Sequence, residues 1–209
     1  NLELTRTLSG DARGSVLATI DRTVSGAGAR LLARHLSAPL MAAEAINRRL
    51  DMVDYFIAGE RLREDVRGTL RQTPDMARAL SRLCLDRGGP RDLSAIRDGL
   101  GAAHNLGGLL ATATLPLPPD GIVATAHNLG RHDRLVEELT NALSPDPPIS
   151  NRDGGFIAPG YRADLDELRG LRDASRKLIM GLESDYRAQT GIDNLKIKHN
   201  RVLGYFIEV

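Results

Sequence analysis

The chain has little aromatic or sulfur chemistry. It lacks tryptophan, aromatic residues make up 3% of its 209 residues, and Cys84 is its only cysteine. A single cysteine excludes an internal disulfide and a cluster of thiolate metal ligands, and it fits a reducing compartment. Because Cys84 lies within the apolar pattern of Leu80, Leu83 and Leu85, we expect a buried and unreactive thiol.

Neither sign of charge dominates, and long apolar runs are missing. Lys and Arg total 28 and Asp and Glu total 27, which gives a formal net charge of +1. This balance lacks the basic excess of a self-sufficient nucleic-acid-binding protein, so any DNA contact must be local. No stretch approaches the roughly 20 apolar residues that span a bilayer, and no signal peptide opens the sequence. We therefore expect no membrane association.

The rest of the composition favours helix. Leu, Ala, Arg, Asp and Glu dominate, and the sparse aromatics fit a mainly α protein. Ile46, Leu50, Val53 and Ile57 form one apolar face at four-three-four spacing, which predicts a helix that ends at Gly59. Helices are also predicted over residues 28–36, 62–70, 74–85, 92–110 and 122–143. Residues 15–21 form a short apolar element, and a short alternation over 1–4 predicts a strand. Turns or loops are expected over 10–14, 87–90, 115–121 and 144–148.

The final part of the chain has a different pattern. Residues 161–189 carry an apolar heptad seam, which predicts a single helix roughly 40 Å long at 1.5 Å per residue. Gly191 is the glycine that ends it. Apolar and polar residues then alternate through 195–199 and 203–209, so the sequence predicts two strands joined near Asn200 and Arg201. The seam positions are Tyr161, Leu165, Leu168, Ile179, Leu182 and Tyr186, and the polar residues Arg172 and Ser175 occupy its two middle positions.

Several short motifs follow one another in a fixed order. They are Asn1-Leu2-Glu3-Leu4, Pro90-Arg91-Asp92-Leu93, Asp153-Gly154-Gly155, Gly160-Tyr161, the run over residues 190–198, and Gly204-Tyr205-Phe206-Ile207-Glu208-Val209. This order and spacing resembles the MutS family of DNA mismatch-repair proteins, and the resemblance covers essentially the whole chain. Three positions depart from the family pattern: Ala77 stands where a glutamate is usual, His199 replaces an aromatic residue, and Phe206 replaces a tyrosine.

The resemblance implies a fold and a division into domains. The fold would be mainly α: an elongated, multi-helix core or lever domain with a long lever helix that ends in a short, truncated β element. Residues 1–158 would form the MutS-like core (lever) domain. Residues 159–209 would hold the long lever helix and the first strands of the clamp domain. The start at Asn1 and the end at Val209, inside a strand-like run, indicate a segment of a longer protein.

The resemblance also implies a function. A full-length MutS protein is a mismatch-recognition ATPase that binds mismatched double-stranded DNA as a homodimer, uses ATP with Mg²⁺, and engages a repair factor of the MutL type. This implies a bacterial cytoplasmic protein associated with the nucleoid. The phosphate loop G-x-x-x-x-G-K-[ST] is missing from these residues, so we expect no catalytic, cofactor or metal site within this segment. Two alternatives remain open: a MutS-like paralogue in recombination or ribosome-associated work, and a helical scaffold with no DNA role.

Lys196, Lys198 and Arg201 are the candidate functional residues. Alternation puts Lys196 and Lys198 on one face of the predicted strand. At the tip of a long helix, their ammonium groups and the Arg201 guanidinium would contact DNA phosphates without reading the base sequence. A solvated polar strand face explains the same pattern, so both interpretations stay open.

Other patterns have structural explanations. The glycines of residues 26–31 imitate a dinucleotide-binding loop, but the third glycine position is Leu31, so we predict a helix start there. The five histidines show no metal-ligand spacing. Asp164, Asp166 and Glu167 suit the positive end of the dipole of the long helix, as a solvated cap.

Overall fold

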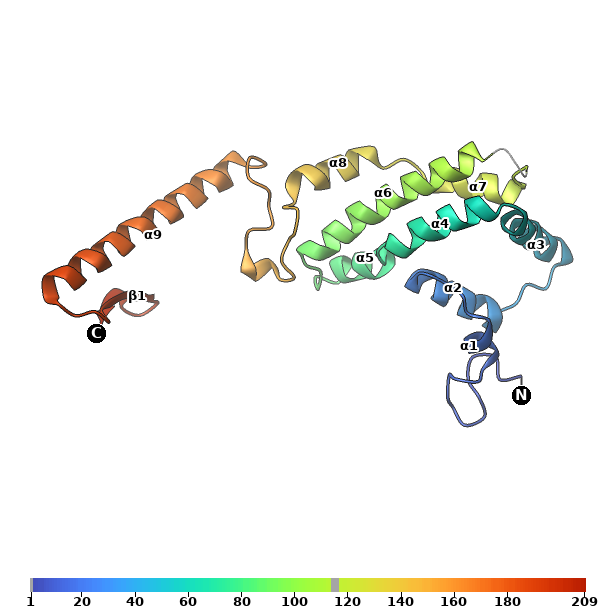
Figure 1. Ribbon diagram of the computed structural model, residues 1–209, viewed down its shortest axis with the longest axis horizontal. Coiled ribbons are helices and arrows are strands. Elements are labelled where there is room, and N and C mark those ends of the chain that lie inside the picture. The colour runs from blue at the N-terminus through green and yellow to red at the C-terminus, as the bar shows by residue number, and fades with distance from the viewer. Residues whose placement is uncertain (1, 114–116) are drawn as a thin grey trace. The chain divides into compact units, whose positions relative to one another are not determined.

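The computed structural model describes residues 2–113 and 117–209, and the chain divides into two compact units, Asn1–Ala158 and Pro159–Val209 (Figure 1). Most of the described residues are helical, and the second unit ends in a two-stranded antiparallel sheet. The predicted mainly α fold class is therefore confirmed. Among the described helices, none is both long and apolar enough to cross a membrane.

The first unit is built around helix α6. Helices α4, α5, α7 and α8 all pack against α6, which runs between them in Figure 1. The buried core is formed by Tyr55, Leu110 and Ile122, which come from α3, α6 and α7. The elements of this unit are α1 (Val16–Ile20), α2 (Gly26–Ser37), α3 (Ala43–Ala58), α4 (Glu60–Gln72), α5 (Met76–Cys84), α6 (Pro90–Thr112), α7 (Asp120–Asn128), α8 (Asp133–Ala142) and the 3₁₀ turn η1 (Asn151–Asp153).

Side-chain caps fix where several of these helices begin. The hydroxyl of Ser15 accepts a hydrogen bond from the Ala18 amide at 3.2 Å, and the hydroxyl of Ser25 accepts one from the Gly28 amide at 3.2 Å. Such caps satisfy amides that have no partner within the helix. Gly26 therefore opens α2, and the predicted helix start is confirmed at the sequence that imitates a dinucleotide loop.

Two predictions about secondary structure were wrong. Residues 122–143 do not form one helix: α7 ends at Asn128 and α8 begins at Asp133, because Gly130 takes a positive φ of 67° that an α-helix cannot contain. Residues 2–4 do not form a strand. Two of their carbonyl oxygens instead accept hydrogen bonds from amides at the start of α1. Glu3 O accepts one from the Val16 amide at 3.1 Å, and Leu4 O accepts one from the Leu17 amide at 2.9 Å. Asn1 of that predicted strand, and Leu115 and Pro116 of the predicted 115–121 loop, lie outside the described residues.

The expected burial of Cys84 was also wrong. Cys84 is exposed, and its neighbours Leu80 and Leu85 are 55% and 65% exposed. Helix α5 is short and buries Ala79 completely, with Leu83 half-buried. The apolar residues of α5 lie on one face of the helix, and Leu80 and Cys84 form the edge of this face that stays exposed.

The second unit consists of one long helix and a hairpin. Its elements are α9 (Ala163–Thr190), β1 (Lys196–Asn200) and β2 (Gly204–Glu208). Gly191 ends α9 in the left-handed conformation, with φ at 68°, as the sequence predicts. At the other end, the Asp166 carboxylate accepts a hydrogen bond from the Gly160 amide at 2.6 Å and pairs with Arg169. These two interactions lower the pKa of Asp166, which lies in the first turn of α9 with Asp164, although no side chain caps the helix at Arg162.

Candidate nucleic-acid interface

The hairpin that carries the candidate cations has a defined register. Lys196 lies opposite Glu208 and Lys198 opposite Phe206, and the pairing continues to Asn200 opposite Gly204. Because side chains two residues apart on a strand share a side, Lys196 and Lys198 lie on one face of β1. Both side chains are exposed, so this face is open to a polyanion.

Arg201 lies in the turn between β1 and β2. The conformation of this turn is fixed by Asn200 and Gly204. The Asn200 side-chain oxygen accepts hydrogen bonds from the amides of Val202 at 3.0 Å and Leu203 at 2.7 Å. Gly204 begins β2 with a φ of 70°, a conformation that favours glycine. The turn leaves Arg201 exposed beside Val202, which is 90% exposed. The tip of the hairpin therefore combines one cation with exposed apolar surface.

The charges of the hairpin only partly cancel. Lys198 forms an ion pair with Glu208, and both side chains are 50% exposed. Exposed pairs of this kind are weak and are screened by salt, so a phosphate can compete for the ammonium group. Within the described part of the chain, Lys196 and Arg201 have no ion-pair partner.

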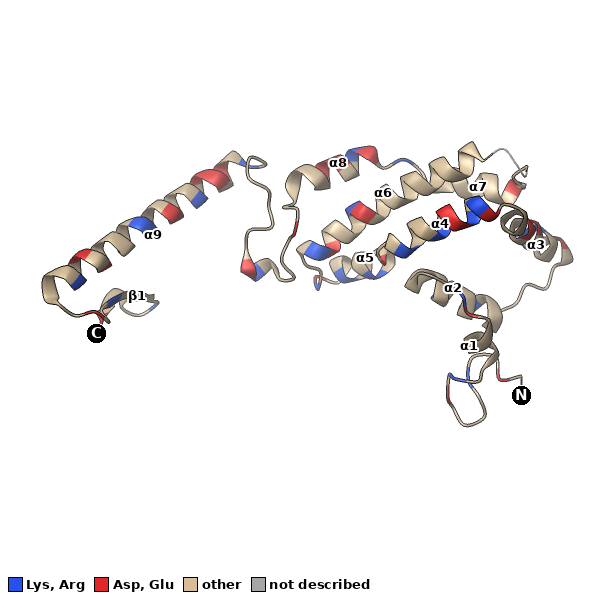
Figure 2. Cartoon of the chain, viewed as in Figure 1, with Lys and Arg blue, Asp and Glu red and all other residues tan. Residues whose placement is uncertain are grey.

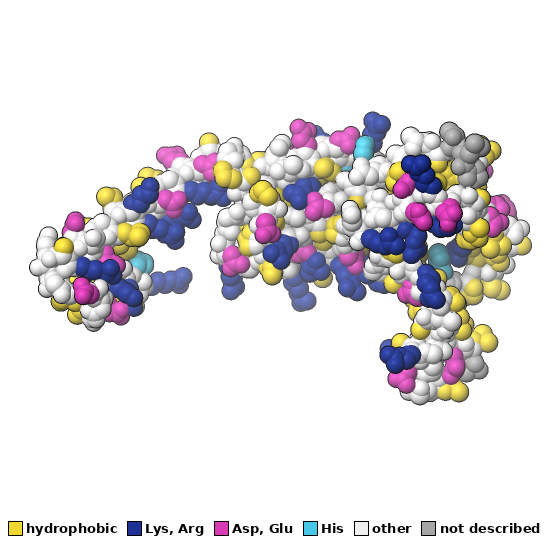
Figure 3. All heavy atoms as spheres, viewed as in Figure 1, with side chains coloured by type: hydrophobic (Ala, Val, Ile, Leu, Met, Phe, Trp, Pro, Cys, Tyr) yellow, Lys and Arg dark blue, Asp and Glu magenta, His cyan; other side chains and the backbone are white. Residues whose placement is uncertain are grey.

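Figure 2 shows charges of both signs along α9, and Figure 3 shows Lys and Arg side chains projecting from the hairpin end of this unit.

Two side chains of α9 hold the hairpin in place. Glu183 Oε2 accepts a hydrogen bond from the Ile197 amide at 2.9 Å, and Arg187 Nε donates to Leu195 O at 2.7 Å. The two side chains also pair with each other at 2.5 Å. Glu183 thus occupies an amide that β1 would otherwise leave unpaired at its edge. Our sequence reasoning missed this anchor, although the i, i+4 spacing of Glu183 and Arg187 was a signal for a pair on one helix face.

An apolar layer lies between the end of α9 and the hairpin. It surrounds a small cavity of about 260 Å³. Ile179, Leu182 and Tyr186, which are predicted heptad positions, line it from the helix. Ile197 and Phe206 line it from the strands. The last part of the predicted seam therefore packs beneath the hairpin.

We expect Glu183→Ala to loosen the hairpin from α9. The substitution removes the acceptor of the Ile197 amide and the partner of Arg187. A charge-assisted hydrogen bond contributes about 1.5–3 kcal/mol, so hydrogen exchange at the Ile197 amide should accelerate by about tenfold or more. Asp185→Ala is the matched control, because Asp185 is an exposed acid of the same helix turn. Equal exchange rates in the two variants would show that Glu183 does not anchor β1.

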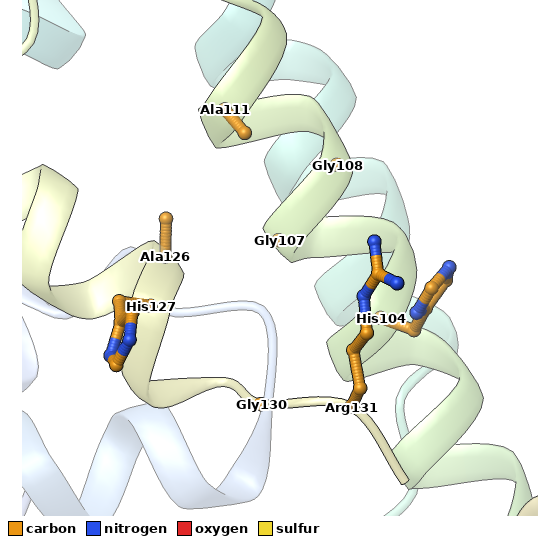
Figure 4. Close-up of a pocket in the computed structure, with 8 residues that line it drawn as sticks. All are labelled: His104, Gly107, Gly108, Ala111, Ala126, His127, Gly130 and Arg131. Atoms are coloured by element: carbon orange, nitrogen blue, oxygen red, sulfur yellow. The ribbon is translucent and has the colours of Figure 1, made fainter. Parts of the chain in front are cut away.

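Elsewhere, a pocket of about 590 Å³ lies between α6, α7 and the α7–α8 link (Figure 4). His104, His127 and Arg131 are its polar residues, and glycine and alanine form most of the remainder. Figure 4 shows that the two imidazoles point apart, so they cannot act on one substrate atom. His104 Nδ1 faces Asp133 Oδ1 at 3.7 Å, but no serine, threonine, cysteine or lysine lines the pocket. In the described parts of the chain, no three His, Cys, Asp or Glu side chains are grouped to hold a metal ion.

Comparison with known proteins finds similarity along the whole chain. The family model for MutS domain III matches residues 1–200. The chain is 54% identical over 210 residues to the DNA mismatch repair protein MutS of Rhodopseudomonas palustris (strain HaA2). It is 53% identical over 209 residues to that of Ruegeria pomeroyi and 50% identical over 208 residues to that of Paracoccus denitrificans. Each similarity covers 100% of this chain and 23% of the relative's length.

Proposed function

Since this chain belongs to the MutS family of DNA mismatch-repair proteins, we propose that it links an ATPase to a DNA clamp in a mismatch-recognition protein. In this proposal, residues 1–158 form the core (lever) domain. Residues 159–209 form the lever helix and the first strands of the clamp. The division of the chain into two compact units at Ala158 and Pro159 supports these boundaries.

The observation that carries the proposal is a cationic hairpin fixed to a long helix. Lys196, Lys198 and Arg201 are exposed, and the side chains of α9 hold the hairpin through Glu183 and Arg187. A helix of 28 residues is a stiff support, so a displacement at one end reaches the other. Cations on such a support would contact phosphates and contribute affinity without base specificity.

The activity of the whole protein is proposed from the relatives alone, because the chain spans 23% of their length. The relatives are named for DNA mismatch repair, which fits a partner of mismatched double-stranded DNA. The same proposal includes a homodimer, bound ATP and Mg²⁺, a downstream factor of the MutL type, and a place on the bacterial nucleoid in the cytoplasm. The ATP-binding motif would lie outside these 209 residues, which contain no G-x-x-x-x-G-K-[ST] loop.

A salt-dependent DNA titration tests the proposed function. We expect the chain to bind matched and mismatched duplexes weakly and equally, since no base-reading element is involved. Each neutralised phosphate contributes about 0.9 to the slope of log K against log salt, so three cations predict a slope of about −2 to −3. Replacing Lys196, Lys198 and Arg201 with alanine should remove most of this slope and lower the affinity by about tenfold or more at low salt.

The control for this experiment replaces three other cations of the same unit. Arg172, Arg176 and Lys177 lie on α9 away from the hairpin, so their alanine variant changes the net charge equally. It should retain most of the DNA affinity. Equal losses in the two triple variants would show that the hairpin is not the contact surface, and unchanged affinity in the hairpin variant would contradict its proposed role.

A further inference from the structure

The segment that carries α1 and α2 forms a small structure of its own within the first unit. The two helices contact each other, and in the described part of the chain neither contacts any of α3 to α8 as extensively. Hydrogen bonds hold the segment together internally: the Val16 amide donates to Glu3 O at 3.1 Å, and the buried Ser15 hydroxyl donates to Ala12 O at 2.7 Å. We call residues 2–37 the N-terminal arm and helices α3 to α8 the bundle.

A short link joins the arm to the bundle (Figure 1). It spans residues 38–42 and contains neither helix nor strand. Met41 within it is 92% exposed, so the link is not packed on the bundle there. Such a link limits how far the arm can move, but it does not fix the angle at which the arm meets the bundle. Side-chain contacts therefore decide how the arm docks.

Arg30 of α2 makes a two-point contact with the bundle. Its Nη1 and Nη2 donate to Oδ2 and Oδ1 of Asp75 at 2.7 and 2.8 Å, so each guanidinium nitrogen meets its own carboxylate oxygen. Paired forks of this kind are stronger and more directional than a single hydrogen bond. The hydrogen bond from Arg30 is the main cause that lowers the pKa of Asp75, which keeps this carboxylate ionised near neutral pH.

Asp75 also caps α5. Its Oδ1 accepts a hydrogen bond from the Arg78 amide at 3.3 Å, and Arg78 Nε lies 3.5 Å from Oδ2. The cap holds the carboxylate at the start of α5, where Arg30 reaches it, and the Asp75 side chain is only 26% exposed. The group that receives the arm is therefore oriented by the bundle itself.

A second polar contact runs in the opposite direction. Arg67 of α4 donates to Arg22 O, in the loop between α1 and α2, at 3.0 Å. The Asp21 carboxylate shapes this loop by accepting hydrogen bonds from the Thr23 amide at 2.8 Å and from its hydroxyl at 2.7 Å. Guanidinium groups thus hold the arm at two places. Contacts of this kind, partly open to water, separate more readily than a buried apolar core.

We propose that the N-terminal arm docks on the bundle and releases from it as one body, with the fork between Arg30 and Asp75 as the latch and residues 38–42 as the hinge. This inference does not depend on the DNA contact proposed above. In the docked state Asp75 binds Arg30 and caps α5, and in the released state it only caps α5. Release leaves the bundle folded, because the core of Tyr55, Leu110 and Ile122 contains no residue of the arm.

Amide hydrogen exchange of the 209-residue chain tests the latch. Arg30→Lys keeps the positive charge but cannot form the fork. We expect exchange of the α2 amides to accelerate by about fivefold or more, because a released helix of this length is only marginally stable in water. Asp75→Asn should have the same effect on α2 while the Arg78 amide stays protected, since asparagine is also a good helix cap. In both variants the α6 amides should exchange at the wild-type rate.

Arg34→Lys is the matched control. Arg34 is an exposed arginine of the same helix, and in the described residues it forms no ion pair. Its replacement should leave the exchange of α2 unchanged. Equal acceleration of α2 in Arg30→Lys and Arg34→Lys would overturn the proposal. It would also be overturned if the α6 amides accelerated as much as those of α2, because the fork would then support the whole unit.

A distance measurement shows whether the arm moves as a body. Spin labels are placed at Ala27→Cys of α2 and Arg71→Cys of α4, two exposed positions, in a Cys84→Ser background. With the latch intact we expect one narrow distance distribution. Adding Arg30→Lys should broaden it and extend it to longer distances. An unchanged distribution in that variant, or a distribution that is already broad with the latch intact, would contradict the proposal.

Discussion

Replacing Asp92 with alanine is expected to lower the free energy of unfolding of the first unit by about 2–3 kcal/mol. Asp92 is 8% exposed and joins three parts of the structure. One carboxylate oxygen accepts a hydrogen bond from Arg82 Nε of α5 at 2.9 Å, and the other accepts one from the Gly89 amide at 3.0 Å. The substitution thus removes the cap of α6 and its charged tie to α5. Urea unfolding of the two proteins measures the difference.

The control for Asp92 is Asp98→Ala in the same helix. The Asp98 side chain is 53% exposed and pairs only with its neighbour Arg97. Exposed ion pairs contribute about 0–1 kcal/mol, so Asp98→Ala should change the free energy of unfolding little. Similar losses in the two variants would show that Asp92 has no special structural role.

The contribution of Asp92 should also depend on pH. The hydrogen bond from Arg82 lowers the pKa of Asp92, and the Gly89 amide adds to this effect, while burial opposes it. A carboxylate whose folded-state pKa lies below its unfolded value of about 3.9 stabilises the fold above that value. This stabilisation is lost as the pH falls through the folded-state pKa. The stability difference between the wild type and Asp92→Asn should therefore be constant near neutral pH and shrink in acid.

Replacing Gly89 with alanine is expected to cost about 1–3 kcal/mol, because the new methyl group has no room. Its Cβ would overlap the backbone carbonyl oxygen of Ile149, which cannot move without shifting the loop that follows α8. That loop is held to α6 by the hydrogen bond from Arg91 Nε to Pro147 O at 3.0 Å. The expected result is a lower melting temperature together with faster hydrogen exchange at the start of α6.

Gly101→Ala is the matched control for Gly89. A Cβ at Gly101, in the middle of α6, would meet nothing within 4 Å. Alanine is the better helix former by about 1 kcal/mol, so Gly101→Ala should raise the stability. If both alanine variants are stabilised, the contact between Gly89 and Ile149 does not constrain the fold.

Local signals in the sequence were enough to predict the secondary structure of most of the chain. Helix ends are marked by Gly59 and Gly191, and alternation after residue 195 marks the hairpin. These features depend on residues close together in the chain, so the sequence displays them directly. The same holds for Lys196 and Lys198, whose shared strand face follows from their spacing.

The sequence by itself thus determined the helices, the hairpin and the family to which the chain belongs. Only the tertiary structure decided which apolar faces are covered. Periodicity shows that a face is apolar, but whether another element packs on it depends on distant residues, so the apolar stripe of α3 and the thiol of Cys84 proved exposed. The anchoring of the hairpin by Glu183 was decided in the same way, because Glu183 and Ile197 lie 14 positions apart in the sequence, which is too far for a local pattern to show their contact.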